Sequence, residues 1–185
     1  MRYLRLLSLT LALGLTACFL QHPQLIGSAE KVQPGQWGGD WVAQSNSEGK
    51  EQIFRVTDVD PAHGIFEIQN ADSDDNKKFE LHLRRVGKQL FLDMRHKPED
   101  LWILFVVEAA TPEKIVLAWQ PSAASFEAAI ARGDFKAKLS KYGDDNVAEV
   151  AFAEMNEKEA EMLAENWREL YLDERITLKR LVVAD

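Results

Sequence analysis

Apolar and polar residues alternate along most of the chain between Trp37 and Trp119, and this alternation predicts a series of short β-strands. We expect strands at 53–59, 64–69, 77–86, 89–95, 101–107 and 114–119, separated by turn signals such as Pro61, Gly64 and Gly87. The run 101–107 is continuously apolar, which is typical of a strand buried on both faces. Short strands about ten residues apart predict an antiparallel meander that forms a sandwich or a barrel.

The pattern changes after Trp119, where two segments have helical spacing. Residues 122–132 have Ser122 or Ser125 as the cap of their start and end before Gly133. Residues 156–171 begin with Asn156 and Glu159 at the spacing of a capping box. The second helix carries one apolar stripe with glutamates opposite, so we expect it to pack against the sheet and not to lie on a membrane. Further strands are expected near 135–139, at 147–153 and at 174–183. The predicted fold class is therefore mostly β with two helical segments.

The first residues have the layout of a secretory signal. Arg2 and Arg5 precede an apolar run that is too short to span a membrane, and small residues follow it. The tetrapeptide 15–18, Leu-Thr-Ala-Cys, resembles the lipobox of bacterial lipoproteins. The resemblance implies that a diacylglycerol group alkylates Cys18, that residues 1–17 are removed, and that two or three acyl chains anchor the protein stably. Phe19 in the next position favours the outer membrane, with the protein facing the periplasm.

Charge and cysteine content narrow the possible partners. The net charge of −8 becomes −10 once Arg2 and Arg5 are removed, which disfavours nucleic acid and electrostatic adhesion to anionic lipid. Cys18 is the single cysteine, so no disulfide can form within the chain and stability must come from an apolar core.

The segment 35–44 contains Gly-x-Trp twice, and the second copy runs directly into an extended segment. A Gly-x-Trp that opens the first strand resembles the lipocalin and wider calycin group. This resemblance implies an up-and-down barrel plugged at one end by a tryptophan, across which an arginine from the last strand packs. Gly39 and Trp41 are the first choice for this barrel closure, with Trp37 as the second choice for the plug and Arg180 as the cover.

These features divide the chain into three parts. Residues 1–17 are the signal peptide, residues 18–34 are a lipidated and partly disordered tether, and residues 35–185 form a single lipocalin-like barrel domain that ends in a helix and a closing strand. Large apolar side chains are expected to point into the barrel and to line a ligand site or fill it, and both alternatives remain open. These candidates are Phe54, Phe66, Phe79, Leu81, Leu83, Leu92, Trp102, Phe105 and Trp119.

The sequence offers no constellation that points to catalysis, a cofactor or a metal. The four histidines, at positions 22, 63, 82 and 96, lack metal-ligand spacing, and His22 is expected to be mobile within the tether. The acidic run 70–76 lacks the glycine of a calcium loop and is interpreted as a hairpin tip. Asp93 and Arg95 lie on one strand face near His96, which favours a cross-strand ion pair.

The leading expectation is a non-enzymatic, lipid-anchored envelope protein whose barrel binds a small apolar or amphipathic ligand such as a lipid. The alternative is an envelope interaction or assembly protein that has a filled barrel and uses Phe91 and the second helix as contact areas.

Overall fold

The computed structural model describes residues 19–45, 51–72, 77–95, 100–141 and 147–181. In chain order its elements are β1 (Leu20–His22), β2 (Ser28–Ala29), β3 (Gly39–Ser45), β4 (Glu51–Asp60), the 3₁₀ turn η1 (Pro61–His63), β5 (Ile65–Asn70), β6 (Lys78–Val86), β7 (Gln89–Arg95), β8 (Trp102–Ala110), β9 (Lys114–Ala118), α2 (Ala123–Arg132), β10 (Ala137–Lys141), β11 (Ala148–Phe152), α3 (Glu157–Leu170) and β12 (Arg175–Arg180). Cys18, His96 and residues 73–76 of the acidic turn lie outside the described residues.

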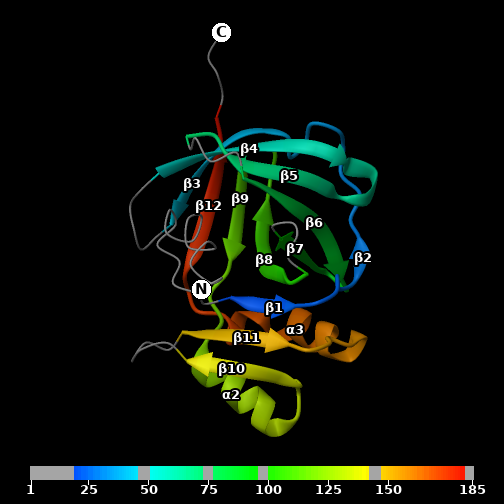
Figure 1. Ribbon diagram of the computed structural model, residues 1–185, viewed down its shortest axis with the longest axis vertical. Coiled ribbons are helices and arrows are strands. Elements are labelled where there is room, and N and C mark those ends of the chain that lie inside the picture. Colours follow the sequence, from blue (N-terminus) through cyan, green and yellow to red (C-terminus); the bar gives the residue numbers. More distant parts are fainter. Residues whose placement is uncertain (1–18, 46–50, 73–76, 96–99, 142–146, 182–185) are drawn as a thin grey trace.

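Eight antiparallel strands close into a barrel in the order β3-β4-β5-β6-β7-β8-β9-β12 (Figure 1). The ring closes because β12 pairs with β9 on one edge and with β3 on the other. We call the end where β3 begins and β12 finishes the closed end, and the opposite end the mouth. The predicted mostly β fold, with a lipocalin-like antiparallel barrel and a closing strand, is confirmed.

The chain between β9 and β12 forms a separate layer outside the barrel. Strand β11 pairs with β10 and, in parallel, with β1, while β1 pairs with the first half of β8. The barrel wall therefore continues through β1 into β11 and β10. Helix α2 packs on β10 and β11, while α3 contacts α2 and the barrel strand β6 (Figure 1). We call β1, β10, β11, α2 and α3 the outer layer. This insertion precedes the last barrel strand, so the strands expected near 135–139 and 147–153 are not barrel strands.

Both helices begin and end where their sequences predict. The Ser122 hydroxyl accepts from the backbone N–H of Ser125, and Gly133 takes the left-handed conformation (φ 81°) that ends α2. Asn156 and Glu159 form the complete capping box of α3. The Glu159 carboxylate also accepts from the backbone N–H of Lys136 at 2.7 Å, which ties the helix start to the chain before β10.

Two apolar cores share one wall of the barrel. In β8, Phe105 and Val107 point into the barrel, whereas Leu104 and Val106 point outward against the outer layer. This explains the continuous apolar run, since both faces of the strand are buried. The inner core, inside the barrel, includes Trp37, Trp41, Phe54, Phe66, Leu83, Leu92, Phe105 and Leu117. The outer core includes Leu20, Val86, Phe91, Leu104, Val106, Phe126, Phe135, Val150, Leu163 and Trp167.

Residues 19–34, expected to be a partly disordered tether, instead pack on the barrel. Phe19, Leu20, Ile26 and Val32 are buried, β1 pairs with two strands, and β2 pairs with the end of β6. The expectation was wrong because the segment contacts partners far along the chain and needs no regular period of its own. The folded domain therefore includes Phe19, the residue next to Cys18.

Candidate ligand-binding site

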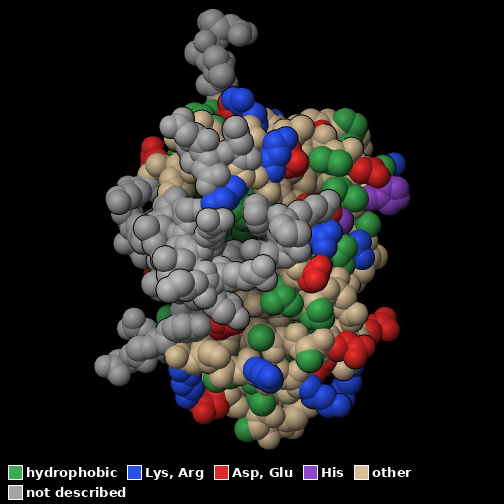
Figure 2. Space-filling model, in the orientation of Figure 1, with side chains coloured by type: hydrophobic (Ala, Val, Ile, Leu, Met, Phe, Trp, Pro, Cys, Tyr) green, Lys and Arg blue, Asp and Glu red, His purple; other side chains and the backbone are tan. Residues whose placement is uncertain are grey.

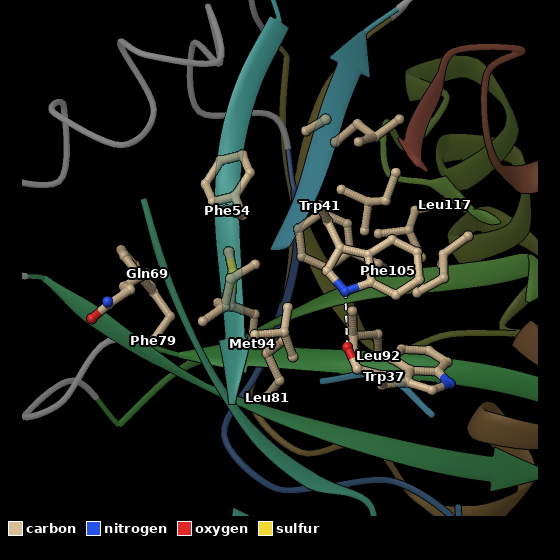
Figure 3. A pocket seen from close by; sticks show the side chains of 16 residues that line it. Trp37, Trp41, Phe54, Gln69, Phe79, Leu81, Leu92, Met94, Phe105 and Leu117 are labelled. Carbon is tan, nitrogen blue, oxygen red and sulfur yellow. Dashed lines mark hydrogen bonds between the residues drawn. The ribbon is translucent and has the colours of Figure 1, made fainter. Parts of the chain in front are cut away.

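The inner core leaves an apolar cavity of about 70 Å³ in the barrel interior. Figure 3 shows its lining side chains converging from opposite walls, with the Trp41 indole among them and the Gln69 amide turned away. Its lining residues are Trp37, Trp41, Ala43, Phe54, Val56, Ile68, Gln69, Phe79, Leu81, Leu92, Met94, Phe105, Ile115, Leu117, Ile176 and Leu178. A dry apolar cavity of about 150 Å³ accepts benzene, so this one holds a group roughly half that size without rearrangement.

The closed end of the barrel is sealed by the two tryptophans of the Gly-x-Trp repeats. The Trp41 indole N–H donates to the Trp37 carbonyl at 2.8 Å (Figure 3), and the Trp37 ring stacks on Phe66 with centroids 5.7 Å apart. The Arg180 guanidinium lies 4.8 Å over the Trp41 ring, as the sequence predicts. Arg180 also donates to the carbonyls of Gly35 and Gln36, which fixes the chain that leads into β3.

Gly39 occupies a position that favours glycine. Its φ is 121°, a conformation that side-chain-bearing residues rarely adopt, and a Cβ atom there would stand 3.9 Å from the Arg180 guanidinium. Glycine at this position lets β3 begin directly beside the Arg180–Trp41 stack.

Most of the predicted inward side chains do lie inside the barrel. Five line the cavity: Phe54, Phe79, Leu81, Leu92 and Phe105. Phe66, Leu83 and Trp119 belong to the inner core but do not line the cavity. Phe66 stacks on Trp37 at the closed end, and Trp119 lies beside Phe19.

Trp102 is the exception, and its prediction as an inward residue was wrong. Trp102 lies three positions before Phe105, and an odd spacing along a strand places two side chains on opposite faces. Its ring packs outside the barrel against His82 at 4.8 Å and under the Arg95 guanidinium at 4.2 Å. Arg95 in turn pairs with Glu80 across β6 and β7 at 3.2 Å. The expected cross-strand ion pair exists, but its acid is Glu80 and not Asp93.

Several cavity residues were missing from the sequence prediction. Small or flexible side chains such as Ala43 and Met94 complete the lining, together with Ile115, Leu117 and Ile176. These residues alternate in step with the large inward residues, so the alternation marks them as inward too. The prediction named only large side chains and therefore omitted them. Ala43 leaves space in the cavity because its side chain is small.

A buried polar site lies between the barrel and the outer layer. His22 and Asp93 are both fully buried, and His22 Nε2 lies 2.8 Å from Asp93 Oδ1. His22 Nδ1 contacts the Gln24 carbonyl, which can only accept, so Nδ1 carries the hydrogen and Nε2 faces the Asp93 carboxyl. Each buried group thus has a polar partner, which limits the cost of burying it. The expected mobility of His22 was wrong.

Burial dominates the electrostatics of this polar site. It raises the pKa of the Asp93 carboxyl, against the lowering effects of the His22 hydrogen bond and of the charges on Arg84 and His82. Burial also raises the pKa of the Tyr171 hydroxyl, and the negative charge of Asp93 raises it further. Asp93 Oδ2 and the Tyr171 hydroxyl have no hydrogen-bond partner among the described residues.

The described part of the chain contains no group of three or more His, Cys, Asp or Glu side chains arranged to hold a metal ion. Within the same described ranges, no helix is both long and apolar enough to cross a membrane.

The chain matches no known protein-family model, and searches of curated proteins and of solved structures found no match. The barrel and its cavity therefore carry the functional argument. The fold and site define an eight-stranded lipocalin-like barrel with a tryptophan-sealed end and an apolar interior.

Proposed function

We propose that this protein is a lipid-anchored envelope protein whose barrel binds a slender apolar group, such as the end of an acyl chain. The observation that carries the proposal is the apolar wall that the cavity presents to a guest. All of its lining residues except Gln69 are apolar, and the Gln69 amide turns away (Figure 3). Such a cavity stays dry. An apolar group that fills the void makes new van der Waals contacts with the wall, and these contacts favour binding.

The cavity volume limits what the barrel accepts. About 70 Å³ suits a few carbon atoms of an aliphatic chain, and a longer chain requires Met94 or the leucines that line the wall to change rotamer. The proposed ligand is thus one narrow chain end and not a whole lipid enclosed in the barrel.

The binding test uses 6-bromohexanoate, whose bromine quenches tryptophan fluorescence on contact. Trp37 and Trp41 line the cavity, whereas Trp102 and Trp167 lie outside the barrel interior and report the background. We expect saturable quenching, and we expect Ala43→Val, which narrows the cavity, to weaken it several-fold. Non-saturable quenching that is unchanged in the Ala43→Val variant would refute binding in the barrel.

The anchor is a separate part of the proposal, and it rests on the sequence of residues 1–18. The full-length protein should incorporate labelled palmitate and fractionate with the outer membrane, facing the periplasm. The Cys18→Ser variant should lose both properties. A wild-type chain that takes up no label would refute the anchor.

A second function, an interaction or assembly module, is favoured by the small size of the cavity. A barrel that is nearly filled by its own side chains can act as a rigid support for protein contacts. Phe91 cannot be such a contact, because it is fully buried beneath the outer layer, while Glu157, Glu161 and Glu165 of α3 remain exposed. Crosslinking in cells through α3 would capture a discrete envelope partner if this function holds.

A further inference from the structure

The described residues begin at Phe19, which is itself part of the folded domain. The Phe19 side chain is 3% exposed, and its ring contacts Phe105 at 6.2 Å and Trp119 at 5.8 Å between centroids. The Phe19 carbonyl accepts from the backbone N–H of Val150 at 2.9 Å. Any group attached to Cys18 is therefore only one residue away from a buried, fixed position.

This fixed position lies at the mouth of the barrel. Trp119 directly follows Ala118, the last residue of β9, and Ala118 pairs with Arg175, the first residue of β12. Both of these strand ends belong to the mouth, opposite the end sealed by Trp37 and Trp41. The blue start of the described chain in Figure 1 accordingly lies where the barrel meets the outer layer.

The segment after Phe19 cannot swing away as a flexible arm. Strand β1 is hydrogen-bonded to β8 on one edge and to β11 on the other. The buried His22–Asp93 pair holds its end, and the Gln24 side chain donates to the Met155 carbonyl at 3.2 Å. The attachment is therefore rigid on the scale of the domain.

Charge does not compete with the attachment in setting the orientation. The domain is acidic overall, so anionic lipid does not attract it. On the face seen in Figure 2, acidic and basic side chains are interspersed over both the barrel and the outer layer. Among the described residues on that face, charges of one sign do not gather into a separate patch.

We infer that the mouth of the barrel rests on the bilayer that holds the acyl chains, and that the apolar ligand enters the barrel directly from this bilayer. The inference rests on the proposed anchor at Cys18. One residue of extended chain spans only about 3.5 Å, so the rim around Phe19 lies at the lipid surface. A chain end can then pass from the bilayer to the cavity with little exposure to water.

The test compares exposed apolar residues at the two ends of the barrel. Leu101, 47% exposed, precedes β8 at the mouth, whereas Val59 (62%) and Leu181 (40%) lie at the closed end. Leu101→Cys and Val59→Cys variants of the full-length lipidated protein are labelled with bimane. Only the new thiol reacts, because the thiol of Cys18 is blocked by the lipid. The proteins are reconstituted in phosphatidylcholine vesicles that carry brominated acyl chains.

We expect bimane at position 101 to be quenched at least three-fold more than bimane at position 59. Insertion of a twenty-residue Gly-Ser spacer between Cys18 and Phe19, which adds roughly 25 Å of reach, should abolish this difference without releasing the protein. Equal quenching at both ends in a lipidated protein would overturn the orientation and leave the anchor intact. Absence of lipid on Cys18, shown by mass spectrometry, would overturn both.

Discussion

The inner and outer cores share the wall formed by β6, β7 and β8 but differ in packing and polarity. The inner core fills a closed cylinder with side chains that all point toward one axis, and it leaves about 70 Å³ unfilled between Trp41, Leu92 and Phe105. The outer core fills the space between a sheet and two helices, and it encloses the His22–Asp93 pair. The inner core is apolar with spare volume, whereas the outer core includes a buried polar pair.

This difference indicates where the molecule tolerates change. A wall whose two faces are both buried is held from outside by the outer layer, so the inner face does not have to be perfectly packed. Side chains that line the cavity can gain volume or shift around a guest. The outer core holds the N-terminal segment in place, and changes there should affect the whole fold.

The largest expected effect comes from breaking the buried pair. The variant His22→Leu leaves Asp93 buried without its partner, and we expect a loss of about 3–5 kcal/mol in the free energy of unfolding. The double variant His22→Leu/Asp93→Leu removes both polar groups and should recover most of that loss. Urea denaturation measures both, and a single variant within 1 kcal/mol of wild type would show that the pair is not buried as described.

A matched pair of alanines compares the two cores directly. Ala148 in β11 faces the outer core and Ala43 in β3 faces the cavity, and both are buried strand residues. We expect Ala148→Val to cost about 1–3 kcal/mol through overpacking, whereas Ala43→Val should be neutral or slightly stabilising because its methyl groups enter existing space. Equal costs in thermal or urea unfolding would contradict the difference in packing.

The contacts of Arg180 at the closed end should contribute less to the free energy of unfolding than the two core features above. Arg180→Ala removes the stack on Trp41 and the hydrogen bonds to the Gly35 and Gln36 carbonyls, and we expect a loss of about 1–2 kcal/mol. Arg180→Lys keeps the charge but not the planar fork, so it should restore only part of the loss. Full restoration by lysine would show that charge alone matters there.

The smallest expected effect is on the pH dependence of stability. Because burial raises the pKa of Asp93, the folded protein retains a proton that the unfolded chain releases above about pH 4. The Asp93 contribution to stability is therefore full below about pH 4 and falls as pH rises from there through the raised folded-state pKa. The variant Asp93→Asn should show a flatter profile across this window, and a steeper decline in that variant would contradict the assignment.

The barrel was predictable from the sequence because strand alternation and helix capping depend on residues that are close together in the chain. Alternation in 77–86 and 89–95 specifies inward and outward faces, and Asn156 with Glu159 specifies the start of α3. The plug of Trp41 and the cover of Arg180 followed from a motif together with the face of the last strand, and the structure joins them.

The remaining features depend on contacts between distant parts of the chain. The His22–Asp93 contact joins residues 71 positions apart, and the segment around His22 carries no periodic signal. The outer layer folds back beside β1 through pairings that no local pattern encodes. The volume left inside the barrel depends on how many side chains meet at one axis, which a list of inward residues does not give.

The central claim is that the barrel interior admits an apolar chain end, and anomalous diffraction from bromine tests it most directly. A crystal of the mature protein soaked with 6-bromohexanoate should show a bromine peak among Trp41, Leu92 and Phe105, and the peak should disappear in the Ala43→Val variant. Bromine found only on the outer surface, with the interior unchanged, would contradict the account.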